Sequence, residues 1–362
     1  VKLKTTSSFL FIIFTATEIH FLYFSLRNKA GLPWVNLRTP WPISFQLLVP
    51  RYRLFLIILL FDDMRKAILF IITLSLLACE DEISVDLVEA PPAYFVDAWL
   101  NDLDEEQVIT LSWTQAYFDI SPYEPVEGAN VVVSDSEGND LVFTESNPGE
   151  YTWDPNNTTF RIETIGTQFN LRVEVGDEIF TAASELNRVP KVDSIIFTFE
   201  EEQSPFEPEG YYAQFVATDF EGPGDSYWIK SYKNGTLLNN PFDITIAFDA
   251  GFSEGGNIDG VEFIQPIQDS VSPFKEDLDE IEPFQLGDSL YVEIHSITNE
   301  AFTFLQQVQI QTQRDGGFDE IFAEPLENVP SNIINLNSEA RTQVIGFFNV
   351  ASIEGRGRRL SE

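Results

Sequence analysis

The chain has 362 residues, of which 44% are hydrophobic, and it carries 21 Lys and Arg against 58 Asp and Glu. This length predicts about two domains, and the net charge of −37 excludes nucleic acid as a partner because an acidic surface repels phosphate. Cys79 is the one cysteine, and His20 and His295 are the two histidines, which excludes intrachain disulfides and Cys/His metal cages.

The basic residues are concentrated before Cys79. Residues 1–79 contain nine Lys and Arg but three Asp and Glu. Residues 1–63 are apolar and basic, and polar residues interrupt each of their hydrophobic runs before it reaches the ~20 residues of a membrane span. We interpret 1–63 as spurious upstream sequence that the mature product lacks; the alternative is a two-helix membrane anchor.

Residues 64–78 have the organisation of a signal peptide. Met64 is followed by Arg65 and Lys66 and then by a 12-residue apolar run, 67–78, which fits a signal sequence and is too short to cross a bilayer. The run ends in Leu76, Leu77, Ala78 and Cys79, and this order resembles a bacterial lipobox. The resemblance implies cleavage before Cys79 and acylation of its thiol, so the lipid bilayer is an expected partner. The alternative is a chance cysteine after a signal anchor.

We interpret residues 79–92 as an acidic linker that follows the lipidated cysteine. Its Glu80, Asp81 and Glu82 resemble the export signal that directs Bacteroidota lipoproteins to the outer face of the outer membrane. The alternative is a solvated acidic linker without a sorting role. The expected location is therefore the outer membrane, with a lipid anchor and the body of the protein facing outward.

Residues 93–188 are predicted to form a β-sandwich. They contain short segments in which apolar and polar residues alternate, separated by Gly, Asn, Asp and Pro, as in all-β domains. The expected strands are 93–100, 107–113, 129–134, 140–145, 150–153, 169–175 and 178–183.

Residues 191–352 are predicted to form a second β-rich domain with one amphipathic helix. Residues 298–313 place Ala301, Phe304, Leu305 and Val308 on one face at helical spacing, with Thr298 as the N-cap. The expected strands are 193–199, 211–218, 226–232, 244–248, 290–297 and 343–350. Residues 353–362 are a basic tail, which is either a disordered end or a segment that pairs with the acidic surface.

The sequence contains little that points to catalysis. A Ser-His-Asp mechanism would need His295, which lies in an alternating strand, and we find no nucleophile elbow, phosphate loop or dinucleotide fingerprint. We therefore expect no enzymatic activity and no cofactor. One acidic loop offers oxygen ligands for Ca²⁺, although acidic hairpin loops are common without an ion; its residues are Asp135, Glu137, Asn139 and Asp140.

Aromatic side chains favour a binding role. The loop-like stretch 113–123 is dense in rings, which are frequent hot-spot residues at interfaces. The candidate partner contacts are Trp113, Tyr117, Phe118 and Tyr123. The alternative is that part of these rings covers the sandwich.

Several motifs resemble known Bacteroidota surface proteins. Residues 126–131, 135–138 and 148–151 are similar to the carboxypeptidase-regulatory-like, Ig-like β-sandwich. With the lipobox and the segments 296–302, 330–333 and 344–348, their order resembles a Bacteroidota lipoprotein family catalogued as a domain of unknown function.

That resemblance implies an accessory of a TonB-dependent outer-membrane receptor in nutrient uptake, with an unknown ligand. The alternatives are a structural or adhesive surface lipoprotein without a transporter partner, and a surface hydrolase that uses carboxylates. The resemblance brings no catalytic residues with it.

Overall fold

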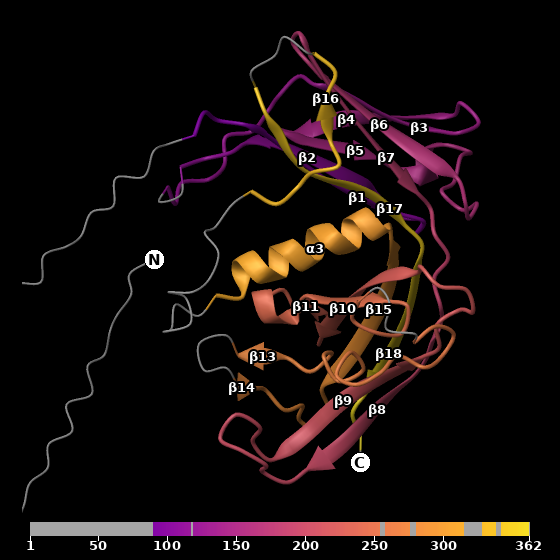
Figure 1. Ribbon diagram of the computed structural model, residues 1–362, viewed down its shortest axis with the longest axis vertical. Coiled ribbons are helices and arrows are strands. Elements are labelled where there is room, and N and C mark those ends of the chain that lie inside the picture. The colour runs from indigo at the N-terminus through magenta and orange to yellow at the C-terminus, as the bar shows by residue number, and fades with distance from the viewer. Residues whose placement is uncertain are drawn as a thin grey trace, which may run out of the picture. The chain divides into compact units, whose positions relative to one another are not determined.

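The fold is mainly β, as predicted, and contains one α-helix within the described residues (Figure 1). The computed structural model describes residues 90–116, 119–253, 258–275, 280–314, 328–337 and 342–361.

Nine strands form the first sheet, in the order β16-β7-β6-β3-β4-β5-β2-β1-β17. Its inward residues, such as Val131 and Tyr151, are fully buried in one apolar core, which explains the alternation in the sequence. Its strands are β1 (Tyr94–Asn101), β2 (Gln107–Trp113), β3 (Asn130–Asp135), β4 (Asp140–Asn147), β5 (Glu150–Trp153), β6 (Gln168–Val175), β7 (Glu178–Glu185), β16 (Ile334–Asn335) and β17 (Val344–Ala351). A 3₁₀ turn, η1 (Pro155–Asn157), follows β5.

The first sheet is built from both halves of the sequence. β17 pairs in parallel with β1, from Tyr94 beside Val344 to Asn101 beside Ala351, and β16 pairs with β7. The expected division into 93–188 and 191–352 therefore does not describe the sheets, because two strands of the C-terminal half complete the N-terminal sandwich. The alternation of apolar and polar residues predicts a strand, but it does not reveal which distant strand pairs with it.

A second sheet of five strands has β10 at its centre, between β15 and the two strands β11 and β12, and β18 lies beyond β15. A two-stranded ribbon of β8 and β9 and a short pair of β13 and β14 accompany it. The strands are β8 (Val192–Glu200), β9 (Gly210–Ala217), β10 (Ser226–Lys233), β11 (Thr236–Leu237), β12 (Thr245–Phe248), β13 (Phe274–Lys275), β14 (Glu280–Ile281), β15 (Ser289–Ile297) and β18 (Ile353–Arg359), with the 3₁₀ turn η2 (Pro241–Asp243) before β12.

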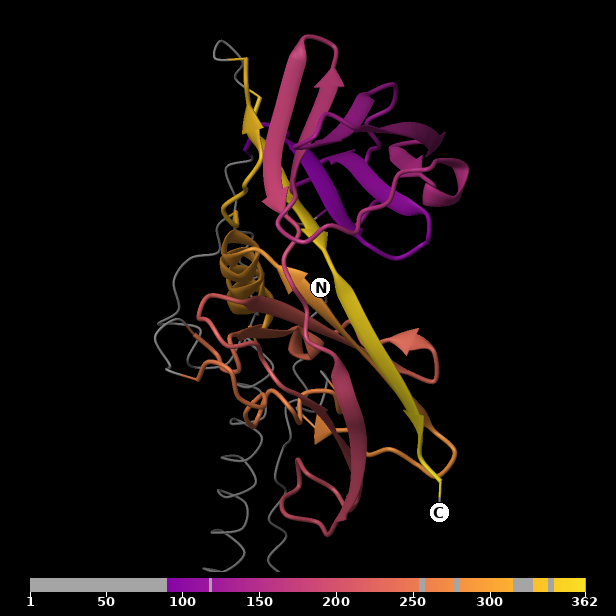
Figure 2. The same ribbon diagram turned by 90° about the vertical axis from the view of Figure 1, so that its right-hand side faces the viewer.

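The C-terminal basic segment is a strand and not a disordered end. β18 pairs antiparallel with β15 over seven residue pairs, and Figure 2 shows it continuing directly from β17, so that one run of chain leaves the first sheet and enters the second. A Cβ at Gly355 would lie 2.3 Å from the Tyr291 hydroxyl. Gly355 thus leaves room for the Tyr291 ring, which lies against the backbone of β18.

The predicted helix is α3 (Asn299–Thr312), and Thr298 is its N-cap, with Oγ1 accepting a 3.1 Å hydrogen bond from the Ala301 N–H. Figure 1 shows α3 between the two sheets. It packs on β12 and β10, as expected, and also on β17. Its buried residues are Ala301, Phe302 and Leu305. No helix in the described part of the chain is both long and apolar enough to cross a membrane.

Candidate functional site

The aromatic stretch forms a loop that leaves β2 and returns to it. The Trp113 N–H donates to the Glu124 carbonyl over 2.8 Å, and the Val126 N–H donates to the Leu111 carbonyl over 3.0 Å. The Ala93 N–H donates to Thr114 Oγ1 over 2.9 Å, which ties the start of the loop to the start of β1. Both ends of the loop are therefore fixed to the rigid first sheet.

Trp113 is held in position by another ring. The antiparallel register places it opposite Tyr94, and the two ring centroids are 4.1 Å apart with 33° between their planes. Tyr94 in turn contacts Phe180 at 4.9 Å. Aromatic pairs of this kind stabilise a fold by more than the burial of their apolar surface alone. The Trp113 indole is therefore held in one orientation.

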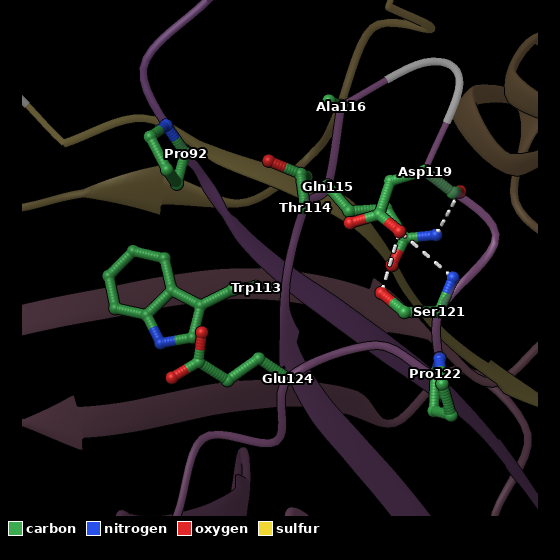
Figure 3. A pocket seen from close by; sticks show the side chains of 9 residues that line it. All are labelled: Pro92, Trp113, Thr114, Gln115, Ala116, Asp119, Ser121, Pro122 and Glu124. Atoms are coloured by element: carbon green, nitrogen blue, oxygen red, sulfur yellow. Dashed lines mark hydrogen bonds between the residues drawn. The ribbon is translucent and has the colours of Figure 1, made fainter.

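A pocket of about 540 Å³ opens beside this indole. Figure 3 shows Trp113 and Glu124 on one side of it and Gln115, Asp119 and Ser121 on the other. Its lining residues are Pro92, Trp113, Thr114, Gln115, Ala116, Asp119, Ser121, Pro122 and Glu124.

A second hollow, of about 770 Å³, shares Trp113 and four further residues of the loop with the first. It extends over the sheet to Phe95 of β1 and Ile345 of β17, and Tyr123 and Glu150 lie at its margin. Tyr123 is 67% exposed. The loop is thus accessible from both sides.

The far side of the pocket is shaped by Asp119. The Ser121 N–H and hydroxyl donate to Asp119 Oδ1 over 2.9 and 2.7 Å, and these hydrogen bonds lower the pKa of the Asp119 carboxyl. The Gln115 amide donates to the Asp119 carbonyl over 2.7 Å. The carboxylate is therefore ionised at neutral pH and faces solvent.

The pocket has the chemistry of a binding site for a cation or a hydroxyl-rich molecule. Carboxylates, an amide and an indole face the solvent, and its described lining residues include no Lys, Arg or His. Such walls accept hydrogen bonds and attract positive charge, and they repel anions.

Of the four predicted contact residues, the structure brings Trp113 and Tyr123 to this site. Tyr117 and Phe118, the lipobox (Leu76, Leu77, Ala78 and Cys79) and the acidic triplet (Glu80, Asp81 and Glu82) lie outside the described residues. The contribution of Ile345 was missed because β17 reaches this sheet only through its distant pairing with β1, which places Ile345 beside Phe95.

The acidic hairpin between β3 and β4 uses its oxygen atoms for hydrogen bonds. The Asp135 carboxylate is buried and accepts from the Glu137 N–H, the Asn139 N–H and the Asn139 side chain over 2.7–2.9 Å. Burial opposes its ionisation, but these hydrogen bonds lower the pKa of Asp135. Asp140 accepts from the Ser134 hydroxyl over 2.6 Å. These contacts account for the acidic loop as an ordinary turn.

His295 belongs to a buried polar group in the second sheet. Its Nε2 lies 3.0 Å from a Glu293 carboxylate oxygen that also accepts from the Tyr232 hydroxyl. Burial, with Lys230 nearby, lowers the pKa of His295 to about 4 against the opposing effect of Glu293. The imidazole is thus neutral at pH 7 and donates a hydrogen bond to Glu293. The Lys230 ammonium lies 3.9 Å from the centroid of the Trp228 ring.

A family model for a domain of unknown function, DUF4249, matches residues 80–356. The chain belongs to the DUF4249 family. The match covers both sheets, α3 and most of β18, so the DUF4249 domain is the whole two-sheet unit and not one of its halves. It begins at the residue after Cys79. No curated protein matches the chain significantly.

Proposed function

We propose that this DUF4249 protein is an outer-membrane lipoprotein, displayed at the cell surface, that serves as the accessory of a TonB-dependent receptor in nutrient uptake. The observation that carries the proposal is the start of the family domain at residue 80, directly after the lipobox cysteine. A chain cleaved before Cys79 would consist of one acylated residue followed immediately by the family domain.

The length of the linker supports a partner in the same membrane. Pro92, which lines the pocket, stands 13 residues after Cys79. An extended chain advances at most about 3.6 Å per residue, so Pro92 lies within about 47 Å of the acylated sulfur. An anchored protein therefore keeps the Trp113 pocket within reach of a receptor that projects from the bilayer.

The composition of the pocket supports a contact or capture role. Trp113 and the exposed Tyr123 are residue types that often dominate binding energy. They surround carboxylates that attract cationic or hydroxyl-rich groups. We propose that this loop contacts the receptor.

The test is purification from the native membrane in mild detergent, with a C-terminal tag and intact-mass analysis of the N-terminal peptide. We expect a triacylated Cys79 peptide and a stoichiometric TonB-dependent receptor identified by mass spectrometry. Tyr123→Ala should reduce the recovered receptor at least about tenfold, as expected of an interface hot spot. Phe206→Ala, which alters a 57% exposed ring on the β8–β9 connection, is the matched control and should recover the receptor fully.

Two other results would contradict the proposal. A lipidated protein recovered alone would favour the structural or adhesive alternative. An N-terminal peptide that retains residues 1–63 would refute the lipoprotein assignment, whatever the protein binds.

A further inference from the structure

Three carboxylates from two connections meet at one end of the second sheet. Asp219 follows β9, Asp249 directly follows β12, and Asp259 lies in the connection after β12. The register of β12 on β10 places Phe248 opposite Ser226, so the end of β12 and the start of β10 lie side by side. One oxygen of each carboxylate lies within 4.8 Å of the others.

The backbone holds these side chains in place. Asp249 Oδ1 accepts from the Gly224 and Asp225 N–H groups over 2.7 and 3.0 Å. Asp259 Oδ2 accepts from the Gly222 N–H over 3.2 Å. All three donors belong to the β9–β10 connection, so that segment fixes two carboxylates that are distant from it in sequence.

Asp219 is the most enclosed of the three, with 4% of its surface exposed. The Tyr227 hydroxyl donates to its Oδ1 over 2.6 Å, and the Gly260 N–H donates to its Oδ2 over 3.3 Å. Burial raises the pKa of the Asp219 carboxyl, and the carboxylates of Asp225 and Asp249 raise it further. The hydrogen-bond donors to Asp219 are thus a phenol hydroxyl and a backbone N–H, both neutral groups.

The nearest cation is already engaged. The Arg188 guanidinium binds the Asp225 carboxylate over 2.6 Å and donates to the carbonyls of Glu221 and Gly222. Within the described part of the chain, no Lys or Arg forms an ion pair with Asp219, Asp249 or Asp259.

A second observation points to a ligand at this position. The other oxygen of Asp259, Oδ1, is buried and has no hydrogen-bond partner. Buried polar atoms are nearly always paired, and each exception calls for a physical explanation such as an ion or a water molecule. An unpartnered carboxyl oxygen beside the buried carboxyl groups of Asp219 and Asp249 is explained by a bound cation.

We propose that Asp219, Asp249 and Asp259 bind a Ca²⁺ ion. Ca²⁺ accepts oxygen ligands at about 2.3–2.6 Å, so two oxygens on one ion lie up to about 5.2 Å apart. Mg²⁺ binds at about 2.0–2.1 Å and requires its ligands to be within about 4.2 Å of one another. The three oxygens lie within 4.8 Å of one another, which is inside the span that one Ca²⁺ ion allows.

The ion would add to the backbone hydrogen bonds that already hold the β9–β10 and β12–β13 connections, such as those from the Asp219 N–H to the Val261 carbonyl and from the Ala250 N–H to the Ile258 carbonyl. It would fix the β9–β10 connection, the end of β12 and the segment around Asp259 to one centre. This role is independent of the proposed function, since the Trp113 pocket lies on the first sheet and shares none of these residues.

The test is Ca²⁺ titration of the full protein after EDTA treatment, by calorimetry and by thermal unfolding at constant ionic strength. We expect one site with a Kd of about 10⁻⁵–10⁻³ M. The Tm should rise by about 5–10 °C at a free concentration near 100 times Kd, and equimolar Mg²⁺ should raise it less.

Asp259→Asn is the informative variant, because an amide keeps one oxygen for the Gly222 N–H while removing a charge. It should be at least as stable as the wild type in EDTA and should lose at least about tenfold in Ca²⁺ affinity. Glu137→Gln, in the acidic β3–β4 hairpin, is the matched control and should bind Ca²⁺ as the wild type does.

Two results would overturn the proposal. In the first, Ca²⁺ raises the Tm of the wild type and of Asp259→Asn equally, which would mean non-specific screening of an acidic surface. In the second, Ca²⁺ has no effect and mild acidification stabilises the wild type but not Asp259→Asn, which would mean that the carboxyl groups share a proton in place of a metal ion.

Discussion

The pairing of β1 with β17 depends on Gly346. Its φ is +105°, and a Cβ at this position would lie 2.0 Å from the carbonyl oxygen of Val96 and 2.8 Å from its carbonyl carbon. Val96 is the residue that pairs with Gly346 in the parallel register. The clash is with backbone in the middle of the ladder, so a change of rotamer cannot relieve it.

Gly346→Ala should therefore be strongly destabilising. A non-glycine residue in a strained backbone region costs about 1–3 kcal/mol. Separating the strands enough to admit a methyl group would break about two ladder hydrogen bonds, at about 0.5–1.5 kcal/mol each. Together these effects predict a loss of about 2–6 kcal/mol in the free energy of unfolding, which is a large part of the stability of an ordinary domain.

Urea unfolding followed by tryptophan fluorescence measures this loss, since Trp99 lies within β1. The matched control is Gly287→Ala, because Gly287 has a φ of +99° and no atom within 4 Å of an added Cβ. The control experiences the backbone strain without the clash. If the two variants differed by less than about 1 kcal/mol, the steric argument for β17 would be refuted.

Two further predictions concern the second sheet and α3. Because the pKa of His295 is about 4 in the folded protein and about 6.5 when unfolded, the unfolded chain binds a proton between these pH values that the folded protein does not. The free energy of unfolding should therefore fall as pH falls from about 6.5 to 4. His295→Gln should reduce the difference between the free energies of unfolding measured in urea at pH 7 and at pH 4.5 by about 2 kcal/mol. If this difference were the same in the variant and the wild type, the prediction would be contradicted. Thr298→Ala removes the N-cap of α3 and should lower the free energy of unfolding in urea by about 1 kcal/mol. Thr303→Ala, on the exposed face of the helix, should lower it less. Equal losses of stability in the two variants would argue against the cap.

Strands such as β1 and β6 were predictable because buried and exposed positions alternate along them. β2 and β5 begin and end at the predicted residues. The helix begins one residue after its predicted start and ends one residue before its predicted end. In each case a local signal suffices: alternation against one core for the strands, and a capping threonine before a helical repeat for α3.

β18 could not be predicted in this way because it has no apolar alternation. Its residues are mainly exposed Gly and Arg, and β15, which supplies its partner groups, ends 56 residues earlier. The pocket beside Trp113 was predicted in part, since its rings lie close together in sequence. The cluster of Asp219, Asp249 and Asp259 was missed because its members lie in two connections that are distant in sequence. No local pattern distinguishes them from the many other acidic residues of the chain.

The parallel partner of β1 also sets the order in which the chain can complete its fold. Val344 is synthesised 250 residues after Tyr94, its neighbour in the sheet, and at about 5–20 residues per second this interval lasts about 12–50 s. Throughout it, one edge of β1 has no neighbour from its own chain, and open edges invite pairing with other chains. The first sheet therefore remains incomplete until β17 has been synthesised.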